Sequence, residues 1–131
     1  PKFWDKVKGT LKLMDGLETR KVLRMTVVKG WNDFDISGYA KLIKLAGERV
    51  MIEVKCYMHL RPVRNRLSQE NMLSDPEVLD FSNKVASELG WKVIYEAPNS
   101  LIALVAEDDW DGRVMDFGNP ITGHLEPAFT C

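Results

Sequence analysis

Two short apolar segments end in polar and aromatic side chains that have the chemistry to bind a ligand. The segments, with the side chains that follow them, are 26–28 with Lys29 and Asn32, and 52–56 with Tyr57 and His59. In α/β folds the carboxyl ends of strands open into loops that hold functional groups on a rigid frame. The two clusters therefore predict a site at one edge of a sheet.

The first cluster allows a second interpretation. Gly30 gives the backbone the freedom that a tight turn needs, and Asn32 and Asp33 are residues typical of turns. Lys29 and Asn32 are thus either ligand-binding groups or parts of a strand-to-helix turn.

Glu53 and Lys55 place charge inside the second apolar segment. In a strand they share one face, while Ile52 and Val54 share the other. Arg24, in the strand expected over 21–29, is a candidate third member of this charged set. Such a face fits either a polar barrel interior or cleft, or a solvent-exposed sheet face with cross-strand salt bridges. If Glu53 and Lys55 are buried, each needs a partner, because an unpaired buried charge is costly.

Arg61, Arg64 and Arg66 form the only dense basic cluster of the sequence. The guanidinium group binds phosphates through two parallel hydrogen bonds, and phosphate contacts dominate affinity for nucleic acids. Tyr57 and His59 add rings that can stack on an unpaired base. The alternative is a solvated loop in which the arginines pair with the acidic residues that follow, Glu70, Asp75 and Glu77.

Length and composition indicate a single globular domain. The chain has 131 residues, 45% of them hydrophobic, and a net charge of −1, so any nucleic-acid surface must be a local patch. No apolar run approaches the ~20 residues of a membrane span, and we expect no membrane partner. The two cysteines, Cys56 and Cys131, form no Cys-x-x-Cys pair, which favours a reduced, cytoplasmic protein.

Helix and strand patterns alternate along the chain. Apolar spacing and capping residues predict helices over 3–17, from Asp35 to Gly47, and from Ser74 to Gly90, where Ser74 and Glu77 have the spacing of a capping box. Strands are expected over 21–29, 50–57, 91–96 and 101–106, with a possible short strand over 113–117. We expect one domain over 1–117 and an irregular tail over 118–131.

This order predicts an α/β fold with a mostly parallel sheet and flanking helices. A sheet of three or four strands would leave its edges open, and unpaired edges are a liability in isolated proteins. The pattern therefore indicates part of a larger sheet or barrel, whose open edge is covered by further chain or by a partner.

Several segments, in order, resemble the radical-SAM tRNA 4-demethylwyosine synthases of wyosine and wybutosine biosynthesis. The matching segments are 20–32 (RKVLRMTVVKGWN), 38–43 (GYAKLI), 52–59 (IEVKCYMH) and 66–72 (RLSQENM), followed by the helix after Glu77. The resemblance extends to about Phe117 and concerns the C-terminal half of that family's catalytic domain. The chain departs from the family pattern at Cys56, at Leu60 to Val63 and at Leu73.

The resemblance implies half of a partial TIM-like barrel that, when complete, holds a [4Fe–4S] cluster and S-adenosylmethionine. The family condenses pyruvate carbons onto N1-methylguanosine of phenylalanine tRNA. It implies that Lys29, Asn32, Glu53 and Lys55 line the cofactor or substrate site, and that Tyr57, His59, Arg61, Arg64 and Arg66 face tRNA.

The family's three-cysteine cluster loop is absent from this sequence, as is the lysine that binds pyruvate. We therefore expect the chain alone to bind neither cofactor, to have no catalytic or metal-binding residue of its own, and to require the missing N-terminal half or a partner chain. The alternative is a non-catalytic α/β module that binds RNA or a protein.

Overall fold

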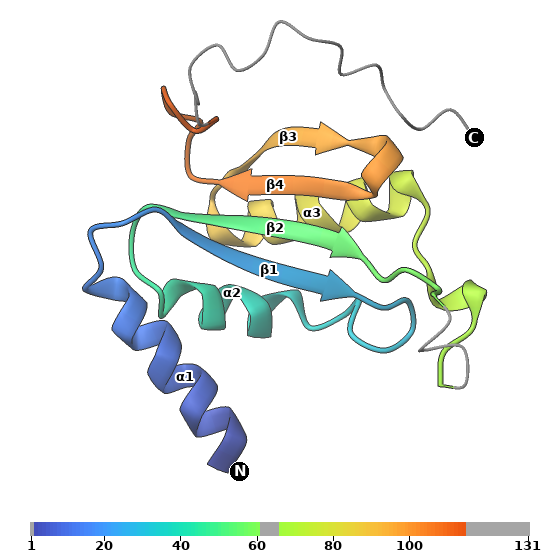
Figure 1. The fold of residues 1–131 in the computed structure, drawn as a ribbon, viewed down its shortest axis with the longest axis horizontal. Coiled ribbons are helices and arrows are strands. Elements are labelled where there is room, and N and C mark those ends of the chain that lie inside the picture. Colours follow the sequence, from blue (N-terminus) through green and yellow to red (C-terminus); the bar gives the residue numbers. More distant parts are fainter. Residues whose placement is uncertain (1, 61–65, 115–131) are drawn as a thin grey trace, which may run out of the picture.

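A four-stranded sheet with helices on one face forms the body of the protein. The computed structural model describes residues 2–60 and 66–114, in which the sheet order is β1-β2-β4-β3 (Figure 1). The strands are β1 (Lys21–Val27), β2 (Val50–Cys56), β3 (Lys92–Ala97) and β4 (Ile102–Ala106). The helices are α1 (Lys2–Asp15), α2 (Ile36–Lys44) and α3 (Asp75–Leu89), with short 3-10 turns η2 (Gln69–Asn71) and η3 (Pro98–Ser100).

The α/β class and the flanking helices are confirmed, but the expectation of a mostly parallel sheet is wrong in detail. Only β1 and β2 pair in parallel, whereas β4 pairs antiparallel with both β2 and β3. The physical reason is the short connection over 98–101, since a parallel return needs a crossover of a dozen or more residues. A short turn can only produce a hairpin.

Local sequence signals explain where the helices begin and end. The Asp35 carboxylate accepts a hydrogen bond from Gly38 N at 3.1 Å and so caps α2. Ser74 and Glu77 form the expected capping box at the start of α3, and Gly90 ends that helix in the left-handed conformation. The predicted short strand does not form at Arg113 and Val114, and the rest of it lies outside the described residues.

The core lies between the sheet and the helices α2 and α3. Along β2, alternate side chains are fully buried on the helix side, and α3 contributes Phe81 and Val85 from its inner face. Within residues 2–60 and 66–114, no helix lies over the opposite sheet face (Figure 1). In this part of the chain, helices therefore cover the sheet on one face only, which is unusual for a parallel strand pair in an α/β fold.

Helix α1 is amphipathic but buries no residue completely. Leu11 and Met14 pack against the core, whereas Phe3 and Leu13 are more than three-quarters exposed. No helix within residues 2–60 and 66–114 is long and apolar enough to cross a bilayer.

Gly47 should tolerate alanine worse than Gly90 does. Both have φ near +70°, but a Cβ on Gly47 would overlap the Asp15 carboxylate and approach Asp15 Cα to 3.1 Å, whereas Gly90 faces open space. We expect Gly90→Ala to lower the free energy of unfolding by about 1 kcal/mol and Gly47→Ala by about 2 kcal/mol or more. Urea titration measures both values, and equal losses would contradict the close approach of α1.

Candidate functional site

The parallel pairing of β1 and β2 brings the two predicted clusters to one edge of the sheet. Their register runs from Lys21 opposite Val50 to Val27 opposite Cys56, so both strands end at the same level. Tyr57 N then donates to Val27 O at 2.8 Å. The strand-end segments 28–32 and 57–59 are therefore neighbours, as the sequence predicts.

Asn32 supports the turn that follows β1. Its Oδ1 accepts a hydrogen bond from Val28 N at 2.6 Å, and its Nδ2 donates to Thr26 O at 3.0 Å. Gly30 has φ 76° and donates from its backbone N to Asp33 Oδ1 at 2.9 Å. Both polar ends of the Asn32 side chain are thus occupied, which favours the turn interpretation for this residue.

Lys29 joins the strand-end turn to the loop that precedes α3. Its backbone N donates to Asn71 O at 2.9 Å, and Asn71 Nδ2 donates back to Lys29 O at 3.1 Å. The Lys29 ammonium also forms an ion pair with Glu77. This reciprocal contact holds segments 28–32 and 66–73 together as one unit.

The Glu77 carboxylate both caps α3 and pairs with Lys29 in this unit. It accepts hydrogen bonds from Ser74 N at 2.8 Å and Ser74 Oγ at 3.0 Å while it pairs with Lys29. The Lys29 ammonium, followed by the Ser74 groups, lowers the pKa of Glu77 from 4.5 to about 2, since all of these donors favour the charged form.

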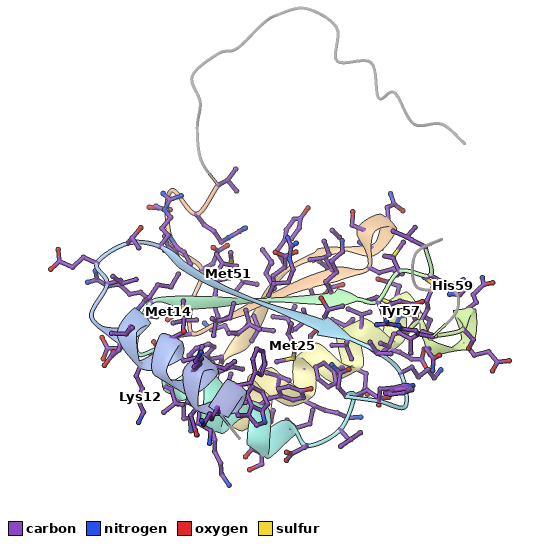
Figure 2. The ribbon with its side chains drawn as sticks, turned by 60° about the horizontal axis from the view of Figure 1, so that its bottom comes forward. Lys12, Met14, Met25, Met51, Tyr57 and His59 are labelled. Atoms are coloured by element: carbon purple, nitrogen blue, oxygen red, sulfur yellow. The ribbon has the colours of Figure 1, made fainter. Side chains whose placement is uncertain are left out.

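Tyr57 and His59 form a second contact at the end of β2. The Tyr57 hydroxyl and His59 Nδ1 are 3.0 Å apart, and their rings meet edge to face (Figure 2). The Tyr57 side chain is only 6% exposed, whereas His59 is partly exposed. His59 is therefore the ring of this pair that is open to a ligand, and Tyr57 holds it in place.

Cys56 is a buried thiol whose hydrogen bonds are made within the protein. Leu73 N donates to Cys56 Sγ at 3.2 Å, and burial raises the pKa of the thiol. Within the described part of the chain, no three His, Cys, Asp or Glu side chains lie close enough to hold a metal ion. The residues that the structure describes thus do not fit an iron–sulfur cluster.

Glu53 and Lys55 lie on the uncovered face of the sheet. Glu53 sits directly opposite Arg24 in the register, and Arg24 Nη2 is 3.0 Å from the Glu53 carboxylate. Lys55 lies opposite Thr26, and within residues 2–60 and 66–114 it makes no ion pair. Arg24 is thus the partner of Glu53, and Lys55 stands beside this pair on the same face.

The basic cluster falls largely outside the described residues. Arg61 and Arg64 lie in the undescribed range 61–65, while Arg66 is exposed where the described chain resumes. Their assignment to tRNA binding, like the assignment of Tyr57 and His59, stays a prediction.

Sequence reasoning missed Asn71, and for Glu77 it expected a capping role or an ion pair with the arginine cluster, not the ion pair with Lys29. Asn71 lies in the segment that resembles the synthases, and a polar residue in a loop after a strand-end site is a signal that favours such a role. The ion pair of Glu77 with Lys29 carries no local signal, because the two residues are 48 positions apart.

Comparison with known families gives the class of this domain. Residues 46–107 match the family model described as wyosine base formation. The match begins just after α2 and extends just past β4, so it includes β2 and the loop with Asn71. A little under half of the chain is therefore similar to the wyosine base formation family.

Curated relatives give the more particular resemblance. The chain is 37% identical over 112 residues to the S-adenosyl-L-methionine-dependent tRNA 4-demethylwyosine synthase of Pyrococcus abyssi, which covers 85% of this chain and 32% of that protein. It is 36% identical over 110 residues to the synthase of Oryza sativa, which covers 82% of this chain and 17% of that protein. The chain thus spans about a third or less of the length of these relatives.

Solved structures agree with this result. The structure of TYW1 with a lysine–pyruvate adduct bound superposes with a TM-score of 0.69 at 29% identity, covering 80% of this chain and 33% of that chain. Archaeal TYW1 superposes with a TM-score of 0.62 at 24% identity, covering 81% and 33%, and shows the fold alone. The expected resemblance to part of the tRNA 4-demethylwyosine synthases is confirmed.

Acid should remove the contribution of Glu77 between about pH 4.5 and pH 2. Because its pKa is lowered on folding, the stabilisation is complete above 4.5 and is lost as pH falls through about 2. At pH 7 we expect Glu77→Gln to lower the free energy of unfolding by only about 1 kcal/mol, since the half-exposed pair is screened by solvent. Urea titrations between pH 2 and pH 7 would show the two proteins converging at low pH, and a constant difference would contradict this assignment.

The Cys56 thiol should be nearly inert in the folded protein. Burial and a raised pKa both reduce the thiolate that reacts with disulfide reagents. In a Cys131→Ser variant, which leaves one thiol, we expect native labelling to be at least ~100-fold slower than labelling in denaturant. Comparable rates in the two conditions would contradict the buried placement of Cys56.

Proposed function

We propose that this chain forms the C-terminal part of the barrel of a tRNA 4-demethylwyosine synthase. The observation that carries the proposal is the one-sided sheet. Among the residues that the structure describes, helices cover one face, while the other face presents charged side chains and has no helix over it. Such a face suits the interior of a barrel that further chain completes. The 37% identity to the P. abyssi synthase over 85% of this chain supports the same role.

In this proposal the uncovered face and the strand ends line the reaction chamber. Lys55 and Glu53 face the cofactor or the substrate, with Arg24 fixing the Glu53 carboxylate. Lys29 contributes from the strand end, whereas Asn32 acts through the turn that it stabilises. The substrate would be N1-methylguanosine of phenylalanine tRNA, and the carbon donor pyruvate.

The cofactors of the complete enzyme would be held largely by the remainder of the protein. The described residues do not supply a cluster site, because Cys56 is buried and hydrogen-bonded to the Leu73 backbone. This chain alone is therefore proposed to be inactive and to depend on an N-terminal half, or on a partner chain, that pairs with the edge of the sheet.

The proposal also assigns the tRNA surface to the loop after β2. His59, Arg66 and the undescribed Arg61 and Arg64 lie in one stretch of sequence between the strand end and the unit formed by Lys29 and Asn71. Arginines this close in sequence to His59 suit contacts with tRNA phosphates.

Binding to purified tRNA tests this assignment. We expect the chain to bind phenylalanine tRNA more tightly than an unrelated tRNA, as measured by fluorescence anisotropy at two salt concentrations. Replacing Arg61, Arg64 and Arg66 with glutamine should weaken binding at least tenfold and reduce the slope of log K against log salt by about 2, since each phosphate contact contributes ~0.7–0.9.

A variant with Lys41, Lys44 and Lys84 replaced by glutamine is the matched control. These substitutions remove three positive charges, as many as the arginine variant loses, from the exposed surfaces of α2 and α3. Equal losses in the two triple variants, or no preference for phenylalanine tRNA, would contradict the synthase role. Binding without tRNA preference would instead favour a general RNA-binding module.

A further inference from the structure

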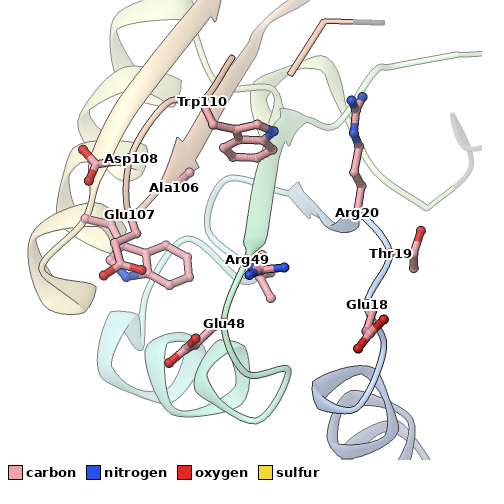
Figure 3. A pocket seen from close by; sticks show the side chains of 11 residues that line it. Glu18, Thr19, Arg20, Glu48, Arg49, Ala106, Glu107, Asp108 and Trp110 are labelled. Atoms are coloured by element: carbon pink, nitrogen blue, oxygen red, sulfur yellow. The ribbon is translucent and has the colours of Figure 1, made fainter. Parts of the chain in front are cut away.

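A cavity of about 500 Å³ lies at the opposite edge of the sheet, at the amino ends of β1 and β2. Four separate segments build it: the loops before β1 and β2, the start of β3 and the segment after β4 (Figure 3). The side chains that line it include two arginines, two tryptophans and four carboxylates. None of them belongs to the candidate site at the carboxyl ends of the strands.

Arg20 and Arg49 place two positive charges on neighbouring strand starts. Each directly precedes a residue of the pair Lys21–Val50, so both lie at the same level of the parallel register. Both side chains line the cavity. Within residues 2–60 and 66–114 neither arginine forms an ion pair, and Arg20 makes one long hydrogen bond, from Nη1 to Arg113 O at 3.4 Å. The two positive charges in the cavity lining suit a bound anion.

The backbone at Arg49 is in a costly conformation. Its φ is 57°, in the left-handed region that suits glycine and that a long side chain rarely adopts. Strain of this kind is found at ligand sites more than elsewhere, because it fixes the direction of a side chain. The strained backbone and the absence of an ion pair within the described residues both indicate that the Arg49 guanidinium has a function.

Trp91 and Trp110 give the cavity flat apolar walls. Trp110 is 38% exposed and Trp91 is partly exposed, so both rings are accessible. Arginine beside an accessible indole is the combination that binds single-stranded nucleotides, with phosphate on the guanidinium and the base stacked on the ring.

The carboxylates around the cavity set a limit on the ligand. Asp108 is paired with Lys92, which leaves Glu18, Glu48 and Glu107 as acceptors. These three would repel a bare polyanion, but they can accept hydrogen bonds from ribose hydroxyls or from exocyclic amino groups of a base. A ligand with one phosphate, a sugar and a base has a partner for the arginines, the tryptophans and the glutamates of the cavity.

We propose that this cavity binds a nucleoside monophosphate unit. Arg20 and Arg49 hold the phosphate, Trp110 or Trp91 stacks on the base, and the glutamates accept from the sugar or the base. The volume lies within the ~300–1,000 Å³ of small-ligand sites. The unit is either a free nucleotide or one residue of a single-stranded RNA, and the proposal stands independently of the synthase role.

Titration of the chain with four probes tests the site. AMP, adenosine, inorganic phosphate and a 5′-phosphorylated oligoadenylate are each followed by isothermal calorimetry and tryptophan fluorescence. We expect AMP to bind at least tenfold more tightly than adenosine or phosphate alone. Tighter binding of the oligonucleotide than of AMP identifies an RNA residue as the ligand, and the reverse order identifies a free nucleotide. Absence of saturable binding by both AMP and the oligonucleotide up to ~1 mM, or AMP binding no tighter than phosphate, overturns the proposal.

Two variants separate loss of the site from loss of the fold. Arg49→Gly removes the guanidinium, yet it suits the left-handed backbone, so the fold should keep its thermal stability while AMP affinity falls at least tenfold. Arg20→Gln should give a similar loss of AMP affinity with little change for adenosine. Lys84→Gln, which removes one charge from α3, should bind AMP as the unaltered chain does. Unchanged AMP affinity in a folded Arg49→Gly variant would overturn the proposal.

Discussion

The parallel register between β1 and β2 determines where every group of interest lies. It aligns the carboxyl ends of the two strands, so that Lys29 and Tyr57 begin neighbouring loops. It also aligns the amino ends, so that Arg20 and Arg49 both line the cavity. A shift of one residue would move the Arg24 and Glu53 side chains out of contact and expose the apolar side chains of β2. The burial of Ile52 and Val54 against the helices therefore fixes the positions of polar groups at both edges.

The two faces of the sheet differ in polarity: one is buried and apolar, and the other carries charged side chains. On the helix side, complete burial of β2 side chains provides the hydrophobic stabilisation of the fold. On the other side, the Arg24–Glu53 pair and Lys55 stand on the same strands, with only 15% of the Glu53 side chain exposed. The face combines charge with apolar neighbours from β4, such as Leu104 opposite Glu53. Such a mixture of charged and apolar side chains suits the lining of a cavity that holds water and a polar ligand. It suits an ordinary solvent-exposed surface less well.

Much of the architecture could be predicted from sequence because its signals are local. Apolar spacing located the helices, and Asp35, Ser74 and Gly90 marked helix ends through contacts within a few residues. Alternation along β2 correctly separated its two faces. The antiparallel position of β4 between β2 and β3 was missed, because strand order depends on packing across the whole sheet. The ion pair of Lys29 with Glu77 and the presence of Arg20 and Arg49 in one cavity were missed for the same reason, because each brings together residues far apart in the chain.

The exposed edge of β1 carries a consequence for handling the protein. Within the described residues β1 pairs only with β2, so its outer backbone N–H and C=O groups are available to another strand. Such an edge can recruit a second molecule and begin aggregation, a hazard that proteins reduce with charged side chains along the edge. Arg24 and the exposed Lys29 supply that protection on and just after β1, while Val22 weakens it. These charges, some of which we propose to line a site, would thus also help to keep the separate domain from self-association.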